Sequence, residues 1–185
     1  DKVVDSTVLG NGLTQIADAI RAKTGTGGTL AFPSGFVSAI EGLSGGGATE
    51  PYIEETYDLN GYLIGAVMHG HTIIRSSAFN GCSFLALTEL PDGVTTIGSQ
   101  AFNGCTKLAL TTLPAGVTKI EYRAFYGCTA LTTITFQGTP TSINSTAFNN
   151  CSNLTTINVP WAEGAVANAP WGATNATIHY NVSGV

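Results

Sequence analysis

The chain has 185 residues and a formal net charge of −5, from 7 basic and 12 acidic side chains. This balance, without a basic patch, argues against nucleic acid as a partner. The absence of a long apolar run argues against membrane insertion, and the chain carries no signal-peptide pattern. Only 10% of the residues are charged, so we expect Thr, Ser, Asn and Gly to cover most of the surface.

Residues 13–43 carry two short helical patterns. Ile16 and Ile20 belong to an apolar stripe at helical spacing, and Pro33 is placed to open a second helix as its first residue. Each helix is too short to be stable alone, so the two must pair with each other, with the rest of the chain or with other chains. We assign residues 1–47 to a two-helix module that ends in a Gly-rich linker.

The string from Leu13 to Gly25, with residues 30–40 after it, resembles a helical module in tail and other structural proteins of phages and prophages of Gram-positive gut bacteria. The resemblance implies attachment to a phage or prophage particle. Residues 13–43 are then the expected place for assembly into a homo-oligomer. A helical hairpin that only caps the fold is an equal alternative.

Residues 52–68 predict a β-hairpin. Two strand-like runs flank Asn60 and Gly61, a dipeptide that favours a tight turn between antiparallel strands. We assign residues 48–67 to a hairpin cap, whose first arm covers the open edge of the structure that follows.

The chain is organised around residues 78–151, where the phrase Ala-Phe-x-x-Cys occurs four times with a spacing of 23 residues. Such self-similarity is typical of a solenoid. Each unit is too short to bury its apolar side chains, so stacked units must share one core. In each repeat we expect a strand after the cysteine, ended by Pro91 in the first, and a second short strand such as 94–97. The cysteines are Cys82, Cys105, Cys128 and Cys151.

Local turns connect these strands. Gly93 and its counterpart one repeat later stand at the corner between the two strands, where we expect positive φ. Ala-Phe-Asn-Gly predicts a tight turn of 3-10 character that inserts Phe into the core. Shifting the pattern back by 23 residues aligns Tyr62 with Leu85 and Val67 with Leu90. The second arm of the hairpin is therefore the predicted first coil.

The cysteine spacing is unlike that of zinc sites, whose cysteines lie two to four residues apart. Stacked strands are about 4.8 Å apart, which is within reach of a disulfide. However, stacked side chains point the same way, which disfavours a bridge. We interpret the cysteines as a column of buried free thiols, with disulfides as the alternative.

The whole pattern, Ala-Phe-x-x-Cys-x-x-Leu, a Leu/Ile strand, Pro, then Val-x-x-Ile, resembles the BspA-like leucine-rich repeats of bacterial surface and phage-borne proteins. The resemblance covers residues 68–160 and implies a leucine-rich-repeat solenoid, mostly β with short 3-10 or turn segments. The first two repeats depart from it: Thr88 and Thr111 occupy the isoleucine position, and Leu87 and Leu110 come one residue earlier. A one-residue shift changes the face of a side chain, so we expect a bulge or a re-aimed strand there.

Residues 161–185 form the predicted C-terminal cap. A short helix or irregular segment should precede a last strand, in which Tyr180 lies 23 residues after Ile157. Trp161 and Trp171 are expected to seal the apolar end of the solenoid. A role in surface binding is the alternative for these tryptophans.

The sequence contains none of the common catalytic or cofactor-binding motifs. It contains no nucleophile elbow, phosphate loop, dinucleotide fingerprint or zinc-protease motif. His69 and His71 share one face of a predicted strand, but no acidic or cysteine partner stands at ligand spacing. We therefore expect no catalytic, cofactor or metal site, and a binding or structural protein rather than an enzyme.

A solenoid offers a rigid, extended surface for binding. The preferred hypothesis is a phage or prophage tail-associated protein, located on the virion, that recognises a host surface protein or glycan. The alternative is a secreted or cell-surface bacterial adhesin with leucine-rich repeats. Aromatic and arginine side chains dominate binding hot spots. The candidate binding surface consists of Lys107, Lys119, Tyr122, Arg123 and Tyr126.

Overall fold

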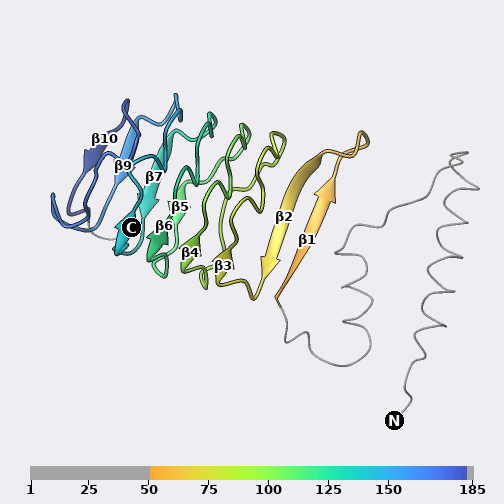
Figure 1. Cartoon of the computed structure of the whole chain (residues 1–185), viewed down its shortest axis with the longest axis horizontal. Coiled ribbons are helices and arrows are strands. Elements are labelled where there is room, and N and C mark those ends of the chain that lie inside the picture. Colours follow the sequence, from red (N-terminus) through yellow and green to blue (C-terminus); the bar gives the residue numbers. More distant parts are fainter. Residues whose placement is uncertain (1–50, 183–185) are drawn as a thin grey trace, which may run out of the picture. The chain divides into compact units, whose positions relative to one another are not determined.

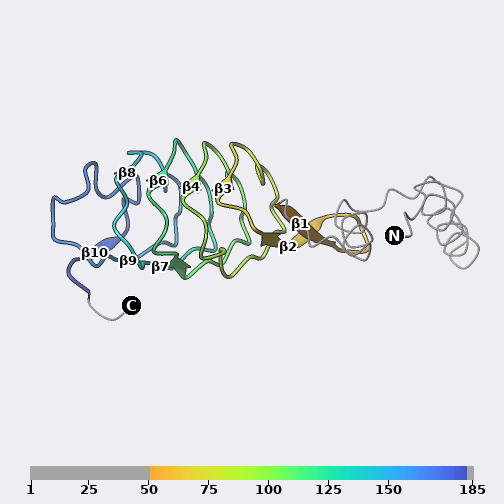
Figure 2. The same cartoon turned by 90° about the horizontal axis from the view of Figure 1, so that it is seen from below.

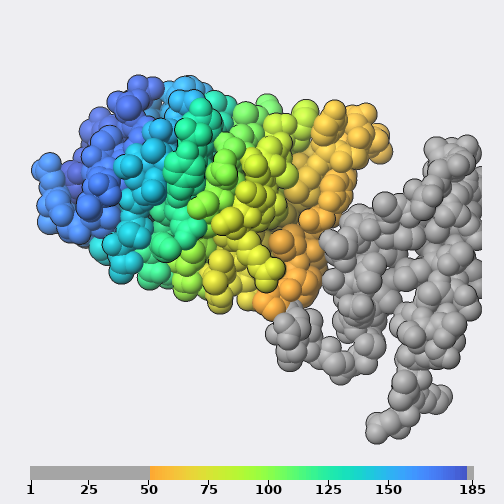
Figure 3. Space-filling view, in the orientation of Figure 1, coloured from red at the N-terminus to blue at the C-terminus, as the bar shows by residue number. Residues whose placement is uncertain are grey.

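The computed structural model describes residues 51–182, so the predicted two-helix module lies outside the described residues. The described residues form a solenoid of ten β-strands without a helix (Figure 1). Figure 3 shows the coils as adjacent bands from the orange hairpin to the blue cap. The strands are β1 (Tyr52–Tyr57), β2 (Leu63–His69), β3 (Ile73–Ile74), β4 (Thr96–Ile97), β5 (Thr112–Leu113), β6 (Lys119–Ile120), β7 (Thr133–Phe136), β8 (Ser142–Ile143), β9 (Thr156–Asn158) and β10 (Thr177–His179).

Two parallel sheets line the coils on two sides, as Figure 2 shows. One has the order β3-β4-β6-β8 and the other β10-β9-β7-β5. In the first sheet Ile74, Ile97 and Ile120 each pair with the residue 23 positions later. The second strand predicted for each repeat is therefore confirmed, although it is only two residues long.

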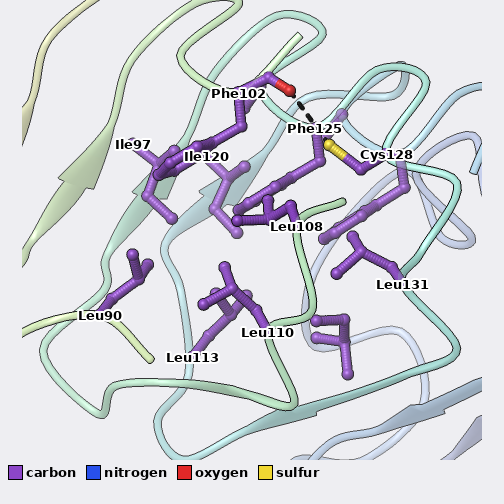
Figure 4. Packing of buried hydrophobic residues seen from close by; sticks show 14 of the residues in the cluster. Leu90, Ile97, Phe102, Leu108, Leu110, Leu113, Ile120, Phe125, Cys128 and Leu131 are labelled. Atoms are coloured by element: carbon purple, nitrogen blue, oxygen red, sulfur yellow. Dashed lines mark hydrogen bonds between the residues drawn. The ribbon is translucent and has the colours of Figure 1, made fainter. Parts of the chain in front are cut away.

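The phenylalanines of the repeated phrase form a column through the core. The rings of Phe79, Phe102, Phe125 and Phe148 stack in parallel, with neighbouring centroids 5.3, 5.5 and 5.1 Å apart. Figure 4 shows Phe102 and Phe125 beside Ile97 and Ile120, with Leu110 and Leu113 below them. Because the coils are spaced like strands of a sheet, each side chain meets its own counterpart in the next coil. The predicted shared core is confirmed.

The Ala-Phe-x-x-Cys phrase forms consecutive tight turns. In the first copy, Ala78, Asn80 and Cys82 each donate their backbone N–H to the carbonyl three residues earlier. The same phrase bonds to the next coil, where Ala101 O accepts the N–H of Phe79 at 2.8 Å. The predicted turn therefore also serves as a link between coils.

Positive φ occurs in this turn and not at the predicted corner. Gly81 has φ of 78°, and its counterparts in the next two repeats have 72° and 69°. Gly93 and Gly116 are not in the left-handed region, so that expectation was wrong. At the corner Val94 N–H donates to Pro91 O at 3.0 Å, a turn that needs no positive φ at the glycine.

Neutral side chains satisfy the exposed backbone between coils. The hydroxyls of Thr95, Thr118 and Thr141 each donate to a threonine carbonyl one coil earlier, at 3.0, 3.1 and 2.9 Å. Likewise, Asn153 Nδ2 donates to Thr129 O at 2.8 Å, while Asn103 Nδ2 links two side chains by donating to Asn80 Oδ1 at 2.9 Å. These repeated bonds explain how the surface is covered with so few charged residues.

The four cysteines are free thiols, as predicted. Cys105, Cys128 and Cys151 are buried, and each Sγ donates to a phenylalanine carbonyl of the preceding coil at 3.0 to 3.1 Å. Figure 4 shows the bond from Cys128 to Phe102. Burial raises the pKa of Cys105 and Cys151 to about 12 and also raises that of Cys128. Their side chains thus act as small neutral hydrophobes.

The first two repeats deviate as predicted. Leu110 is buried and Thr111 is exposed, whereas Ile134 fills the core one position later in the third repeat. The strand of the second repeat, β5, begins only at Thr112, and residues 85–91 of the first repeat form no strand. The re-aiming of this segment is confirmed.

The predicted hairpin is confirmed, with β1 and β2 antiparallel. Its loop is longer than a two-residue turn and contains residues 58–62. Gly61 has φ of 82°, and Asp58 Oδ1 accepts the N–H groups of Asn60 and Tyr62 at 2.9 Å. The Asp58 carboxylate therefore organises the loop together with the glycine.

The second arm also serves as the first coil, since Ala86 N–H donates to Ile64 O at 3.0 Å. The predicted alignment of this arm with the core positions of the later repeats was wrong at two positions. Val67 and Tyr62, which the pattern places in the core, are 55% and 51% exposed. The reason is that β2 is a regular strand and buries alternate residues. The buried residues of β2 are Ala66 and Met68.

The tryptophans close the C-terminal end of the core. Trp171 is fully buried and Trp161 is 6% exposed. The two rings pack edge to face at 6.3 Å, and both contact Phe136. Their sealing role is confirmed, and their burial contradicts the alternative of surface binding.

The last coil is irregular before its strand, without the helix that was one of two expectations. Its strand, β10, pairs with β9. Ile178, and not Tyr180, lies opposite Ile157. The expected 23-residue register was therefore wrong here, because the cap does not contain the repeat phrase that fixes the coil length.

Replacing Phe125 by Ala should lower the free energy of unfolding by about 3–5 kcal/mol, because it leaves a cavity within the ring column. Urea titration followed by circular dichroism measures this change. The exposed Lys107→Ala control should stay within about 0.5 kcal/mol of the parent. Equal stability of the two variants would show that the column is not the core of the solenoid.

Alkylation with iodoacetamide should modify Cys82 first, because it is half-buried whereas the other three thiols are buried. Equal alkylation rates at all four positions in the native protein would contradict this account.

Burial raises the pKa of Cys105 from 9.0 to about 12. The contribution of this thiol to stability is therefore complete below pH 9 and is lost as the pH rises toward 12. Cys105→Ala should flatten the alkaline fall in the free energy of unfolding.

Candidate functional site

Three of the predicted binding residues meet in the turn after β6. The guanidinium carbon of Arg123 lies 4.8 Å from the ring centroid of Tyr126 and 5.1 Å from that of Tyr122. Such cation–π contacts hold a guanidinium against aromatic faces. Tyr126 is itself fixed, because its hydroxyl accepts a hydrogen bond from Asn150 Nδ2 at 2.6 Å. We call Tyr122, Arg123 and Tyr126 the aromatic clamp.

The solenoid turn positions the clamp. Ala124 and Phe125 are fully buried in the core, which leaves the residues around them at the surface. Arg123 has φ of 50°, and its counterparts Ser77 and Gln100 have 60° and 57° in earlier coils. The left-handed conformation is thus a property of the repeated turn and not a strain specific to the clamp.

The guanidinium of Arg123 has no polar partner among the described residues. It makes no hydrogen bond or ion pair within residues 51–182, and its Nε atom is buried without a partner there. A guanidinium presents several N–H donors in one plane, which matches the geometry of a carboxylate. The clamp can therefore receive a carboxylate from outside the protein.

A shallow depression of about 430 Å³ lies beside the clamp, with Lys119 and Tyr122 in its lining. The Glu121 carboxylate in it lies 2.7 Å from Lys119 Nζ and accepts the Ser99 N–H at 3.0 Å. The hydrogen bond from Lys119 is the main reason that the pKa of Glu121 lies below its ordinary value. The other polar groups in the lining are uncharged and come from Ser99, Ser142, Asn144 and Asn168.

Lys107, in the turn after Cys105, takes part neither in the ring contacts of the clamp nor in the lining of the depression. It is exposed and makes no ion pair or ring contact within the described residues. Sequence reasoning missed Asn144 and Asn168. Asn144 occupies the repeat position of Glu121, so periodicity could have found it, but Asn168 comes from the irregular cap and has no such signal.

A metal site is not supported by the described residues, which hold no suitable group of three or more His, Cys, Asp or Glu side chains. His69 Nε2 lies 3.4 Å from Glu54 Oε1, and its ring stacks on Tyr52 at 4.4 Å. His71 lines a separate depression. Within residues 51–182, no helix has the length and apolar character needed to cross a bilayer.

Two solved structures are similar to this chain. A leucine-rich repeat protein from Bacteroides ovatus is 29% identical with a TM-score of 0.50, over 60% of this chain and 28% of that one. A leucine-rich repeat protein from T. pallidum is 21% identical with a TM-score of 0.41, over 71% and 80% of the respective chains. This chain thus matches little more than a quarter of the B. ovatus protein. No curated protein matches the sequence.

The model of the BspA type leucine-rich repeat region matches residues 72–165, in 6 copies. That range is just over half of the chain. It contains all four Ala-Phe-x-x-Cys phrases, the ring column and the aromatic clamp. The chain belongs to the BspA-type leucine-rich repeat family.

Proposed function

We propose that the protein is a non-enzymatic recognition protein that binds an acidic surface of a partner protein through the aromatic clamp. The observation that carries this proposal is the Arg123 guanidinium, held against two tyrosine rings with no ion pair of its own among the described residues. Tyr and Arg are the residues most enriched in binding hot spots. Repeat solenoids commonly serve as scaffolds for protein binding.

The depression beside the clamp complements this role. Lys119 adds a second positive charge, although Glu121 already neutralises it in part at 2.7 Å. The neutral amides and hydroxyls around it suit a polar side chain next to the carboxylate. We infer that a partner inserts an Asp or Glu at Arg123 and a polar neighbour into the depression. A host-surface glycan is the alternative ligand.

We further propose that the protein acts outside the cell, as a secreted or cell-surface bacterial adhesin, because this setting suits a BspA-type repeat. Association with a phage or prophage tail is the second candidate, and it is supported by the sequence of residues 13–40 alone. In either setting, residues 1–47 would attach the recognition solenoid to a larger assembly, with the helical patterns of residues 13–43 as the place for self-association.

Arg123→Ala should weaken saturable binding to matrix deposited by cultured epithelial cells about 30-fold, which corresponds to the 2 kcal/mol expected of a hot spot. Arg123→Lys should lose most of this affinity as well, because an ammonium lacks the planar donor array. Lys107→Ala serves as the matched control for loss of a surface charge. Fluorescence titration with the labelled full chain measures all four proteins.

The two ligand classes are distinguished by treating the matrix. Protease digestion should abolish binding, while periodate oxidation should leave it unchanged. The reverse result would assign the site to a glycan. Parent and Arg123→Ala proteins with equal affinity would exclude the clamp as the binding site.

In light scattering, the intact chain should have the mass of several protomers. The chain without residues 1–47 should have the mass of a monomer. The physical reason is that two short helices gain stability only by packing on other elements. A truncated chain that remains oligomeric would place assembly in the solenoid. Monomers in both cases would make the helical segment a simple cap.

A further inference from the structure

A single backbone hydrogen bond joins β2 of the hairpin to the segment that follows Cys82 in the first repeat. Ala86 N–H donates to Ile64 O at 3.0 Å, but the N–H groups of residues 87–90 donate no hydrogen bond within the described residues. The equivalent segments of later repeats form β7 and β9, which are joined in a regular parallel ladder. The first repeat thus leaves a break in the sheet beside β2.

A groove of about 450 Å³ opens at this break. Residues 65–68 of β2 form one wall and residues 86–91 the other, and we call the groove the β slot. Its lining is mainly apolar and includes Val67, which is 55% exposed. The other apolar side chains that line it are Ala66, Met68, Ala86, Leu87, Leu90 and Pro91.

Both walls offer backbone groups to an occupant. Strand residues point their N–H and C=O groups alternately to the two sides. Because β1 takes one edge of β2, half of the groups in residues 65–68 face the slot. Buried backbone groups strongly favour a hydrogen-bond partner. Two parallel backbone walls with apolar side chains match an extended segment that adds as a strand.

The acidic residues at the β slot indicate the charge of the segment that it binds. Glu89 lies in its lining and Asp92 follows the wall, and both are exposed. None of the lining residues is Lys or Arg. An identical acidic edge from a second copy would meet like charge, which is destabilising across strands. We propose that the β slot binds an extended, apolar segment of a partner protein that carries Lys or Arg on its flanks.

This site is separate from the aromatic clamp, so its test does not depend on the proposed function. The probe is a blocked peptide of sequence Lys-Val-Thr-Val-Thr-Val-Lys, added to about 1 mM so that weak binding is detected. Amide exchange of the full chain is followed by NMR. Binding should slow exchange of the amides of alternate residues in both walls, 87–90 and 65–68, at least about tenfold.

Methylation of the three valine nitrogens of the peptide should weaken binding about tenfold, because it removes donors without changing the side chains. Glu89→Lys should weaken binding about fivefold, an effect that salt reduces. Glu163→Lys, at an exposed position of the C-terminal cap that lies in neither proposed site, makes the same change of charge as the matched control and should bind like the parent. Both variants keep the apolar core, and the exchange pattern without peptide verifies their fold.

Four results would overturn the proposal. The first is no protection at the highest peptide concentration, and the second is equal binding of the methylated peptide. The third is protection confined to residues outside the two walls. The fourth is protection of the walls without peptide that increases with protein concentration, together with dimer formation by light scattering, since this would make a second copy the occupant.

Discussion

Backbone hydrogen bonds between successive coils are the interaction on which the rest of the structure depends. The eight strands after the hairpin are only two to four residues long, and each of them pairs with a strand of a neighbouring coil. The tight turn adds further links, for example from Phe102 N–H to Ala124 O at 2.8 Å. These bonds fix the register at 23 residues, and the register in turn brings identical side chains together in columns.

The columns explain the unusual composition. Buried phenylalanines stack on phenylalanines and buried thiols donate to the carbonyls of the coil before. At the exposed edges, threonine hydroxyls repeat the same bond from coil to coil. Neutral groups therefore make most of the side-chain bonds between coils, with Glu121 as a charged exception that accepts the N–H of Ser99. Arg123 makes no such bond among the described residues.

Both proposed binding sites depart from the regular repeat, the clamp in its side chains and the β slot in its backbone. The aromatic clamp replaces the asparagine of other repeats with Tyr126 and places an arginine before the turn. The β slot lies where the first repeat forms no strand beside β2. The depression beside the clamp receives Asn168 from the irregular C-terminal cap. Both proposed sites thus combine the regular scaffold with a local departure from the repeat.

The sequence by itself determined the solenoid and the coil length, because a strict period forces equivalent residues into equivalent environments. From Asn60 and Gly61 it predicted the hairpin, and it favoured free cysteines over disulfides. It also predicted that Leu110 would be re-aimed. Tertiary structure decided what lies at the ends and at the surface: which residues of β2 enter the core, how β10 pairs with β9, and that Asn168 reaches the clamp region. Periodicity specifies contacts between equivalent positions only. Where the period stops, the packing of particular side chains decides the structure.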